Sequence, residues 1–584
     1  MFKNVPIFVK IVRYNSKLIL KTSKHTIMKT RPFPFLKLFL WIALLLIVPV
    51  DLFAQDILWE KSYGGKHADY LMDAIPTTDY GFILAGSSLS KKSGNKTDDN
   101  VGDLDYWVWK MDERGELDWQ KSFGGPGSDF LQSIKTTKDG GFILAGISNS
   151  TINEEGADSS QARNDKTDAC RGGDDFWIIK LDAKGNQQWQ KTIGGMGQEK
   201  LESIFQTKDG GYILGGSSSS SKTDANEIGE KSSDSFGNLD YWIVKLDSKG
   251  KLVWQKTYGG SYLDELRSIE QTVDGGYIVG GYSNSPASGT KTEHNKGIGD
   301  YWILKLTPVG EIEWQKTIGG DQDDQLYVVH QTDDGNFMVG GNSNSGSSNE
   351  KSKGNESGTD FWVLKLDPLG EILWQETYNI GKVDVLTSLV ENDDHTVLLG
   401  GFAQGERVVS LKKAVKGKDA EIPSALKGTG DYVAIKINEK GEEIWRQSVG
   451  SAGEDLLKKV VETRDGGYLM AGTSKSKVSR DRNSVIGSND FWVVKLKDKT
   501  KPPKVKAVIE AMPNPAVSFT NVVIGYDFES GTATVVDLTG HVLQQFSISS
   551  RTVPVDLSDY AAGVYIINIK TNKGSDGVKV VKGF

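Results

Sequence analysis

Three short phrases recur seven times along the chain, and this repetition limits the available folds more than any other feature. The first phrase opens with a Trp and usually ends in Gly-Gly, with spacings between 60 residues (Trp59 to Trp119) and 71 residues (Trp374 to Trp445). The second phrase is Asp-aromatic-Trp, and its Asp residues are Asp105, Asp175, Asp240, Asp300, Asp360, Asp431 and Asp490, with Val433 replacing Trp in the sixth copy. The third is Thr-x-Asp-Gly-Gly, which reads best at Asp139, Asp209, Asp274 and Asp465 and is degenerate at Asp79, Asp334 and Asp394. Seven copies in 584 residues indicate one large repeat array.

Each repeat resolves into four short strands, A to D. In the second repeat these are residues 131–137, 141–148, 175–182 and 187–193, separated by Gly-containing turns and one long polar loop. The third strand is apolar on both faces, as Phe176-Trp177-Ile178-Ile179 shows, which is typical of a strand covered on both sides. A sheet lying between two neighbouring sheets supplies that environment.

The ends of the array indicate how it closes. Residues 57–65 form a strand D with no strand A, B or C before it, whereas 490–497 form a strand C with no strand D after it. Seven complete repeats therefore require the first strand to dock onto the last repeat. The prediction is an all-β, seven-bladed β-propeller with four strands per blade, closed by its N-terminal strand. An open solenoid is the alternative, and it would leave that strand unpaired.

The segment between strands C and D carries a family resemblance. Leu246-Asp247, Gly250 and Trp254 form a Leu-Asp-x-x-Gly-x-x-x-Trp phrase that resembles the signature of quinoprotein-type propellers. The resemblance covers residues 57 to about 497 and implies that the outer-strand Trp docks against the adjacent blade. It is a repeat-level match that proteins of many functions share.

The N-terminal region, residues 1–54, has the order of a secretory signal peptide. A run of about 13 apolar residues, 38–50, follows basic residues and precedes Ala54, and Gln55 is the expected mature start. Met28 is a candidate true start, because it would open a signal of normal length. The alternative is an uncleaved anchor, for which the run is short, since a spanning helix needs about 20 residues.

A Lys- and Pro-rich linker, 499–506, separates the repeat region, 55–498, from a C-terminal module, 507–584. The module's β-like runs, 522–526, 533–538, 542–546, 564–569 and 577–582, predict a small immunoglobulin-like β-sandwich. Its ordered motifs resemble those of the type A sorting domain of the type IX secretion system, and its marker residues are Pro513, Asn514, Pro515, Asp537, Leu538, Gly540, Gly563, Tyr565, Lys579 and Lys582. The resemblance implies the secretion machinery as a partner, passage across the outer membrane, removal of the module, and surface attachment or release. A generic immunoglobulin-like module is the alternative.

Composition excludes several classes of protein. A net charge of -8 argues against nucleic-acid binding, which needs a concentrated positive surface. Cys170 is the one cysteine, so no intrachain disulfide can form. Membrane contact is expected only through the signal peptide and surface attachment.

Two features point to one face of the predicted propeller. The loops between strands B and C are long, polar and variable, for example 147–173, 217–239 and 402–430, and such loops on a rigid scaffold commonly bind ligands. A carboxylate also begins every strand A: Asp69, Asp129, Glu199, Asp264, Asp324, Asp384 and Asp455. If these seven ring the mouth of a central channel, raised pKa values or a bound cation such as calcium would be expected. In the alternative, which the regularity of the set favours, each carboxylate accepts hydrogen bonds from its own connector.

The sequence supports two functional hypotheses. The first is an exported binding protein that engages a glycan or protein through the long-loop face. The second is an exported enzyme, quinoprotein-like or glycan-active, with its site on that face or in the channel. No catalytic residues and no cofactor are evident, because the six His residues are scattered and no nucleophile motif occurs.

Overall fold

The computed structural model describes residues 55–152, 165–223, 229–355, 358–405, 430–501 and 508–583. The predicted signal region, with Met28 and Ala54, lies outside the described residues. Every regular element in the described ranges is a β-strand. Within these ranges no helix is long and apolar enough to span a membrane.

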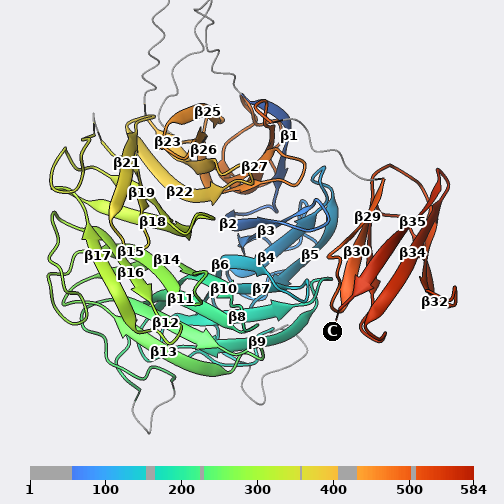
Figure 1. The fold of residues 1–584 in the computed structure, drawn as a ribbon, viewed down its shortest axis with the longest axis horizontal. Coiled ribbons are helices and arrows are strands. Elements are labelled where there is room, and N and C mark those ends of the chain that lie inside the picture. Colours follow the sequence, from blue (N-terminus) through green and yellow to red (C-terminus); the bar gives the residue numbers. More distant parts are fainter. Residues whose placement is uncertain are drawn as a thin grey trace, which may run out of the picture. The chain divides into compact units, whose positions relative to one another are not determined.

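Twenty-eight strands form seven four-stranded antiparallel sheets (Figure 1). The first three sheets are β2 (Asp69–Pro76), β3 (Phe82–Ser88), β4 (Asp105–Met111) and β5 (Leu117–Phe123); β6 (Asp129–Thr136), β7 (Phe142–Ser148), β8 (Asp175–Leu181) and β9 (Gln187–Ile193); and β10 (Glu199–Gln206), β11 (Tyr212–Ser218), β12 (Asp240–Leu246) and β13 (Leu252–Tyr258). The next three are β14 (Asp264–Gln271), β15 (Tyr277–Ser283), β16 (Asp300–Leu306) and β17 (Ile312–Ile318); β18 (Asp324–Gln331), β19 (Phe337–Ser343), β20 (Asp360–Leu366) and β21 (Ile372–Tyr378); and β22 (Val383–Glu391), β23 (Val397–Gln404), β24 (Asp431–Ile437) and β25 (Glu443–Val449). The seventh is β26 (Glu454–Glu462), β27 (Tyr468–Lys475), β28 (Asp490–Lys497) and β1 (Asp56–Tyr63). The sheets are the blades of a β-propeller, each with its strands in sequence order except the seventh.

The strand prediction for the second repeat agrees with β6 to β9 within two residues at every end. The double-sided hydrophobicity of the third strand has the predicted cause, because β8 is buried along its whole length. Residues of adjacent blades alternate in one cluster: Tyr106 of β4 packs on Trp177 of β8 with ring centroids 4.8 Å apart. Each blade therefore shares its core with its neighbours.

The outer-strand Trp docks against the adjacent blade, as the resemblance implied. Trp119 of β5 contacts Phe142 of β7, and its ring lies over Gly185 in the next blade. Gly185 has a φ of +78°, and a Cβ there would lie 2.8 Å from the Trp119 ring. Gly is therefore required both by the turn and by the packing of the neighbouring Trp.

The first strand of the chain pairs with the last repeat. β1 lies antiparallel to β28, from Asp56 opposite Lys497 to Tyr63 opposite Phe491. The first and seventh sheets also share a hydrophobic cluster, in which Trp107 packs on Phe491 with ring centroids 4.8 Å apart. The predicted strand pairing is thus present, and β28 is covered along its outer edge.

The C-terminal module consists of two sheets over one core. One sheet contains β29 (Ile509–Met512), β30 (Phe519–Ile524) and β33 (Thr552–Asp556). The other contains β31 (Gly531–Asp537), β32 (Val542–Ile548), β34 (Gly563–Thr571) and β35 (Ser575–Lys582). Five of these strands match the predicted runs, whereas β29 and β33 were missed. The sandwich is present, and its immunoglobulin-like classification stays a prediction.

Candidate functional site

The seven carboxylates that begin the innermost strands are buried, and none of them lines the cavity described below. One oxygen of each accepts a hydrogen bond from a backbone N–H of the preceding connector, for example from Gly65 to Asp69 at 2.7 Å and from Gly320 to Asp324 at 2.6 Å. The same contact is made by Asp129, Glu199, Asp264, Asp384 and Asp455. These are the contacts expected in the favoured alternative, in which each carboxylate accepts hydrogen bonds from its own connector. Binding of a cation such as calcium by this register stays a prediction.

The Asp residues that begin the third strands lie near the carboxylates that begin the innermost strands, across the boundaries between blades. Burial, together with the neighbouring charge of Asp324, raises the pKa of Asp300 to about 7. Oδ1 of Asp300 and Oδ1 of Asp324 are each buried without a hydrogen-bond partner, a situation that a shared proton would relieve. Corresponding pairs act on each other electrostatically at Asp69 and Asp490, Asp105 and Asp129, Asp175 and Glu199, Asp240 and Asp264, and Asp360 and Asp384.

A buried cation anchors the long loop of each blade in which that part of the loop is described. These residues are Lys96, Lys166, Lys231, Lys291, Lys351 and Arg482. Arg482 donates to Asp490 at 2.5 Å and to Ser474 Oγ at 2.6 Å. The loops are therefore held to the framework at one point, while their segments 153–164, 224–228 and 406–429 lie outside the described residues. Sequence reasoning missed this set of buried cations, although its five Lys residues all stand at the same distance before the Trp of the Asp-aromatic-Trp phrase.

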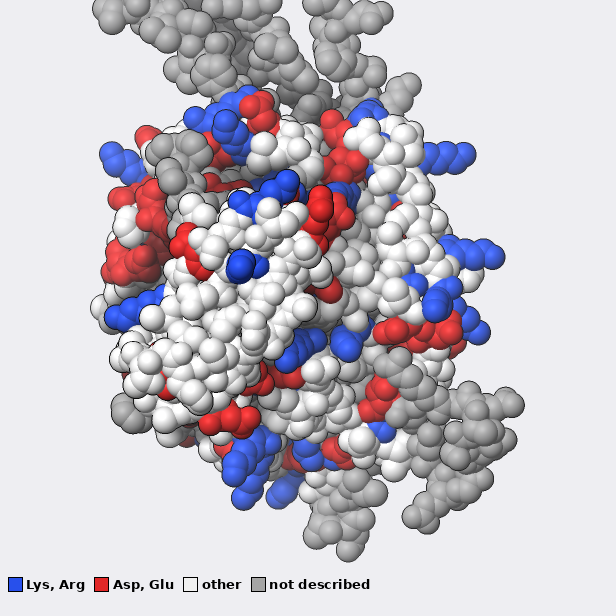
Figure 2. All heavy atoms as spheres, turned by 90° about the vertical axis from the view of Figure 1, so that its right-hand side faces the viewer, with Lys and Arg blue, Asp and Glu red and all other residues white. Residues whose placement is uncertain are grey.

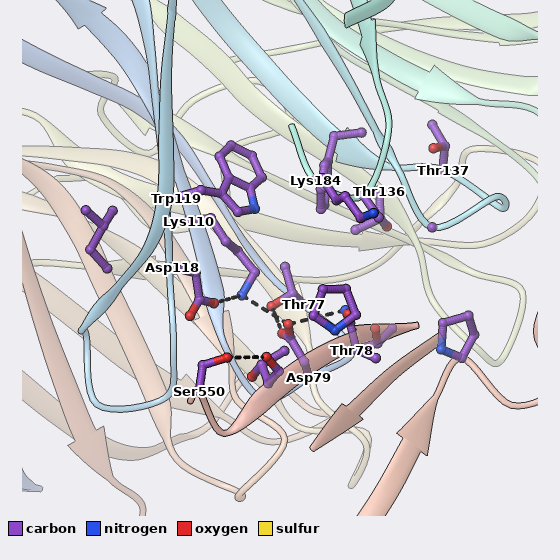
Figure 3. A pocket seen from close by; sticks show the side chains of 18 of the residues that line it. Thr77, Thr78, Asp79, Lys110, Asp118, Trp119, Thr136, Thr137, Lys184 and Ser550 are labelled. Atoms are coloured by element: carbon purple, nitrogen blue, oxygen red, sulfur yellow. Dashed lines mark hydrogen bonds and ion pairs between the residues drawn. The ribbon is translucent and has the colours of Figure 1, made fainter. Parts of the chain in front are cut away.

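Each strand-C lysine forms an ion pair within its own blade, and Lys436 also contacts Asp498, directly after β28 of the seventh blade, at 3.1 Å. Lys110 contacts Asp79 at 3.1 Å and Asp118 at 2.8 Å, and Figure 3 shows its amine directed between the two carboxylates. The equivalent pairs are Lys180 with Asp139, Lys245 with Asp209, Lys305 with Asp274, Lys365 with Asp334, Lys436 with Asp394, and Lys495 with Asp465. The Asp of the Thr-x-Asp-Gly-Gly phrase thus joins the first turn of each blade to its third strand.

The innermost strands β2, β6, β10, β14, β18, β22 and β26 together line one cavity of about 390 Å³, here called the central cavity. Every one of these strands has a β-bulge at the same place. The bulged residues are Met72, Gln132, Glu202, Arg267, Tyr327, Thr387 and Lys458, and all seven line the cavity. A bulge re-aims a side chain and is common beside functional sites. The wall of the cavity therefore carries seven different residue types at one structural position.

Charged side chains dominate one part of this wall. Arg267 contacts Glu202 at 3.1 Å and Glu265 at 2.7 Å, and it lies 5.4 Å from the ring centre of Tyr327. Lys200 contacts Glu265 at 3.2 Å. These groups hold one another in fixed positions at the wall of the cavity.

Two further ion pairs lie on other strands of the same wall. Lys135 contacts Asp73 at 2.8 Å. His330 contacts Glu270 at 2.8 Å, and these contacts raise the pKa of His330 to about 10 although burial opposes the charge. His330 is therefore charged at neutral pH.

Lys458 and Lys459 are adjacent in β26, and the bulge turns both towards the cavity. Within the described residues no hydrogen bond or ion pair reaches either amine. Burial lowers the pKa of both lysines. Sequence reasoning missed this pair because the two positions differ from blade to blade, and no other repeat has two adjacent basic residues there.

The predicted sorting residues hold the C-terminal module together. Asn514 donates to the carbonyl of Lys579 at 2.7 Å and accepts from the N–H of Val581 at 2.8 Å. Lys582 donates to the carbonyl of Leu557 at 2.6 Å. The other marker residues lie as follows: Pro513 and Pro515 between β29 and β30, Asp537, exposed Leu538 and Gly540 at the β31–β32 turn, and Gly563 and Tyr565 at the start of β34. Gln55, the predicted mature start, is buried beside β1 and donates through its N–H to Gln447 at 2.8 Å.

One group of side chains in the described residues has metal-binding spacing. Asp333, Glu391 and His395 lie on the first turns of adjacent blades, with candidate ligand atoms within 4.8 Å of one another. They are largely exposed, and Glu391 already accepts the N–H of Asp333. None of the three lines the central cavity, although Glu391 lies 3.8 Å from Nε2 of His330, which does.

Comparison with known proteins assigns the C-terminal module. Residues 510–583 match the model of the family described as secretion system C-terminal sorting domain. A curated relative, Regulatory protein FlaEY of Caulobacter vibrioides, is 23% identical over 277 residues, which are 45% of this chain and 28% of that protein. The chain thus spans less than a third of the length of this relative.

Solved structures with detectable similarity have low TM-scores. A fungal alcohol oxidase of the AA5 family, in complex with copper, has a TM-score of 0.41 and 12% identity, over 91% of this chain and all of that chain. The Pan2 WD40 domain of Neurospora crassa has a TM-score of 0.37 and 10% identity, over 78% of this chain and 98% of that chain. YCF48 bound to D1 peptide has a TM-score of 0.35 and 8% identity, over 78% of this chain and all of that chain. The chain joins a β-propeller to a type IX sorting domain, which indicates export to the cell surface or beyond.

Proposed function

We propose that the protein is an exported, surface-attached or released binding protein, built as a closed seven-bladed ring that the sorting domain carries across the outer membrane. The sequence match of residues 510–583 supports the route. The pairing of β1 with β28 and the core shared by the first and seventh sheets support the closed ring. Such a ring has protected sheet edges and needs no disulfide.

The observation that carries the binding function is the loss of repeat symmetry in the central cavity. The buried registers keep one residue type in nearly every blade, as expected for residues that maintain the fold. The bulged position carries Met, Gln, Glu, Arg, Tyr, Thr and Lys in turn. Residues that only fill a repeated core would repeat with it, so this variation indicates a ligand.

The ligand, a glycan or a protein of the surroundings, would approach from the face that carries the long loops. Lys200 lies at the start of β10, directly after the connector on that face, and it lines the cavity. Acidic and basic side chains are interspersed on the side of the molecule that Figure 2 shows.

A glycan and protein binding array tests this proposal. The purified protein should bind a small set of surface ligands, and Tyr327→Ala should weaken that binding because the ring forms part of the cavity wall. Leu369→Ala is a matched control, since Leu369 is exposed on a turn between β20 and β21. No binding to any member of the array, or equal loss in both variants, would contradict the proposal.

An exported enzyme acting in the central cavity is the second candidate, quinoprotein-like or glycan-active. The lowered pKa values of Lys458 and Lys459 favour it, because such amines are more available as bases or nucleophiles. Incubating each array ligand with the protein and analysing the mixture by mass spectrometry separates the two candidates. New products that disappear with Lys459→Gln would favour the enzyme.

A further inference from the structure

The charges that line the central cavity do not balance. Lys135, Lys200, Arg267 and His330 each have a carboxylate partner within 3.2 Å. Lys458 and Lys459 have none among the described residues, although both lie in the same wall. Two adjacent cations without an ion-pair partner therefore line the central cavity.

This arrangement is costly unless a ligand completes it. A charge in a confined site needs a partner, and the lowered pKa of both lysines reflects that cost. Glu202 and Asp73 act on Lys458 and Lys459 electrostatically, but they form their ion pairs with Arg267 and Lys135. An anionic group at these two amines would balance the cavity and restore their ordinary basicity.

The rest of the wall is suited to hydroxyl groups. Gln132 lines the cavity, and its Oε1 is buried without a hydrogen-bond partner, so it can accept from a ligand hydroxyl. Ser133, Ser203 and Thr387 add short polar side chains, and Tyr327 and Phe205 add aromatic rings. The volume of about 390 Å³ lies within the range of small-molecule sites.

We infer that the central cavity binds a polyhydroxylated carboxylate, such as an acidic sugar or the uronic-acid end of a glycan, with its carboxylate at Lys458 and Lys459. This inference rests on the proposed function and names the ligand class for the same site. Hydroxyl groups of the ligand would bond with Gln132 and its polar neighbours, and a sugar ring would lie against the aromatic side chains.

Isothermal titration calorimetry on the purified full chain tests the inference. The acidic probes are galacturonic acid and trigalacturonic acid. Their neutral counterparts are galactose and a trisaccharide of galactose. An acidic probe should bind, its neutral counterpart should bind at least roughly tenfold more weakly, and the affinity for the acid should fall as salt rises. Binding of the monosaccharide as well as the trisaccharide would assign a free sugar acid as ligand, whereas binding of only the trisaccharide would assign a glycan end.

The double variant Lys458→Gln/Lys459→Gln should weaken binding of the acid roughly tenfold or more while leaving weak neutral binding unchanged. Lys249→Gln/Lys251→Gln is the control with the same change in net charge, because both lysines are exposed at a turn far along the chain from β26. The salt dependence of the unmodified protein keeps the test valid if the double variant fails to fold.

Failure of the inference differs from failure of the proposed function. If neutral glycans bind and Tyr327→Ala removes that binding, the cavity is a binding site but the anion assignment is wrong. If acidic probes bind equally to the double lysine variant, the assignment to Lys458 and Lys459 is wrong. If no probe and no array ligand binds at all, both proposals fall.

Discussion

The carboxyl pairs between blades predict that the propeller is less stable at alkaline than at mildly acidic pH. Asp300 is the best case, because burial and Asp324 raise its pKa from 3.8 to about 7. Below pH 3.8 the group is protonated in both the folded and the unfolded state. As the pH rises, the unfolded chain ionises first, so folding stability falls until the folded carboxyl ionises near pH 7.

The size of this effect follows from the shift. A shift of about 3 units corresponds to about 4 kcal/mol, and the two units above pH 5 correspond to about 2.7 kcal/mol. Asp300→Asn removes the titration. The amide oxygen can still accept the N–H of Lys296, and the amide N–H can donate towards Asp324 in place of the shared proton.

Thermal unfolding at pH 5 and pH 8 measures the prediction. An unfolding entropy of about 2.1 cal/mol/K per residue gives about 0.9 kcal/mol/K for the propeller, so 2.7 kcal/mol corresponds to about 3 °C. The fall in Tm from pH 5 to pH 8 should be about 3 °C smaller in Asp300→Asn than in the unmodified protein. Asp103→Asn, at an exposed carboxylate, should show the unmodified fall. An unchanged pH dependence in Asp300→Asn would refute the shared-proton reasoning.

Three further predictions concern the closing strand, the buried loop cation of the seventh blade and the sorting module. Deleting residues 56–65 removes the partner strand of β28 and the buried Tyr63, so Tm should fall markedly; an unchanged Tm in calorimetry would contradict closure by this strand. Arg482→Met should lower the free energy of unfolding by about 3–5 kcal/mol in denaturant titrations, because it leaves Asp490 charged and buried; a loss below 1 kcal/mol would show that the ion pair is dispensable. Lys582→Ala should destabilise the sorting module by about 1–3 kcal/mol through the loss of its bond to the Leu557 carbonyl, and immunoblots of cell fractions should show less exported protein; normal export would separate this contact from sorting.

Much of the fold could be predicted from the sequence because its determinants are local and repeated. The Gly at each turn has a backbone requirement, as Gly185 with its positive φ shows, and the apolar third strand needs cover on both faces. The displaced first and last strands also predicted the β1–β28 pairing. In the sorting module β29 and β33 were missed, since four or five residues such as Ile509–Met512 carry too weak a pattern.

The ion-pair partners were less predictable, because they depend on how loops return to the framework. Lys110 could be recognised as a repeated residue, yet nothing in its spacing identified Asp79 as its partner across the blade. Five of the six buried loop cations stand at one fixed interval before the Trp of the Asp-aromatic-Trp phrase. Their role depends on contacts between the loop and the framework: Arg482 pairs with Asp490 of the third strand and acts electrostatically on Asp455 of the first strand.

The central cavity was missed for a physical reason that applies to repeat proteins generally. Residues that maintain the fold recur with the repeat, so comparison of the repeats detects Asp324 and overlooks Tyr327, three positions later in the same strand. The bulge in each innermost strand changes which side chains face the centre, and a two-residue alternation cannot anticipate it. A position that varies in every blade is therefore the one to inspect when the repeat has a recurring bulge. By that criterion the seven bulged residues are those on which binding in this ring should depend, and Lys458 is the one among them that is basic and has no ion-pair partner in the described residues.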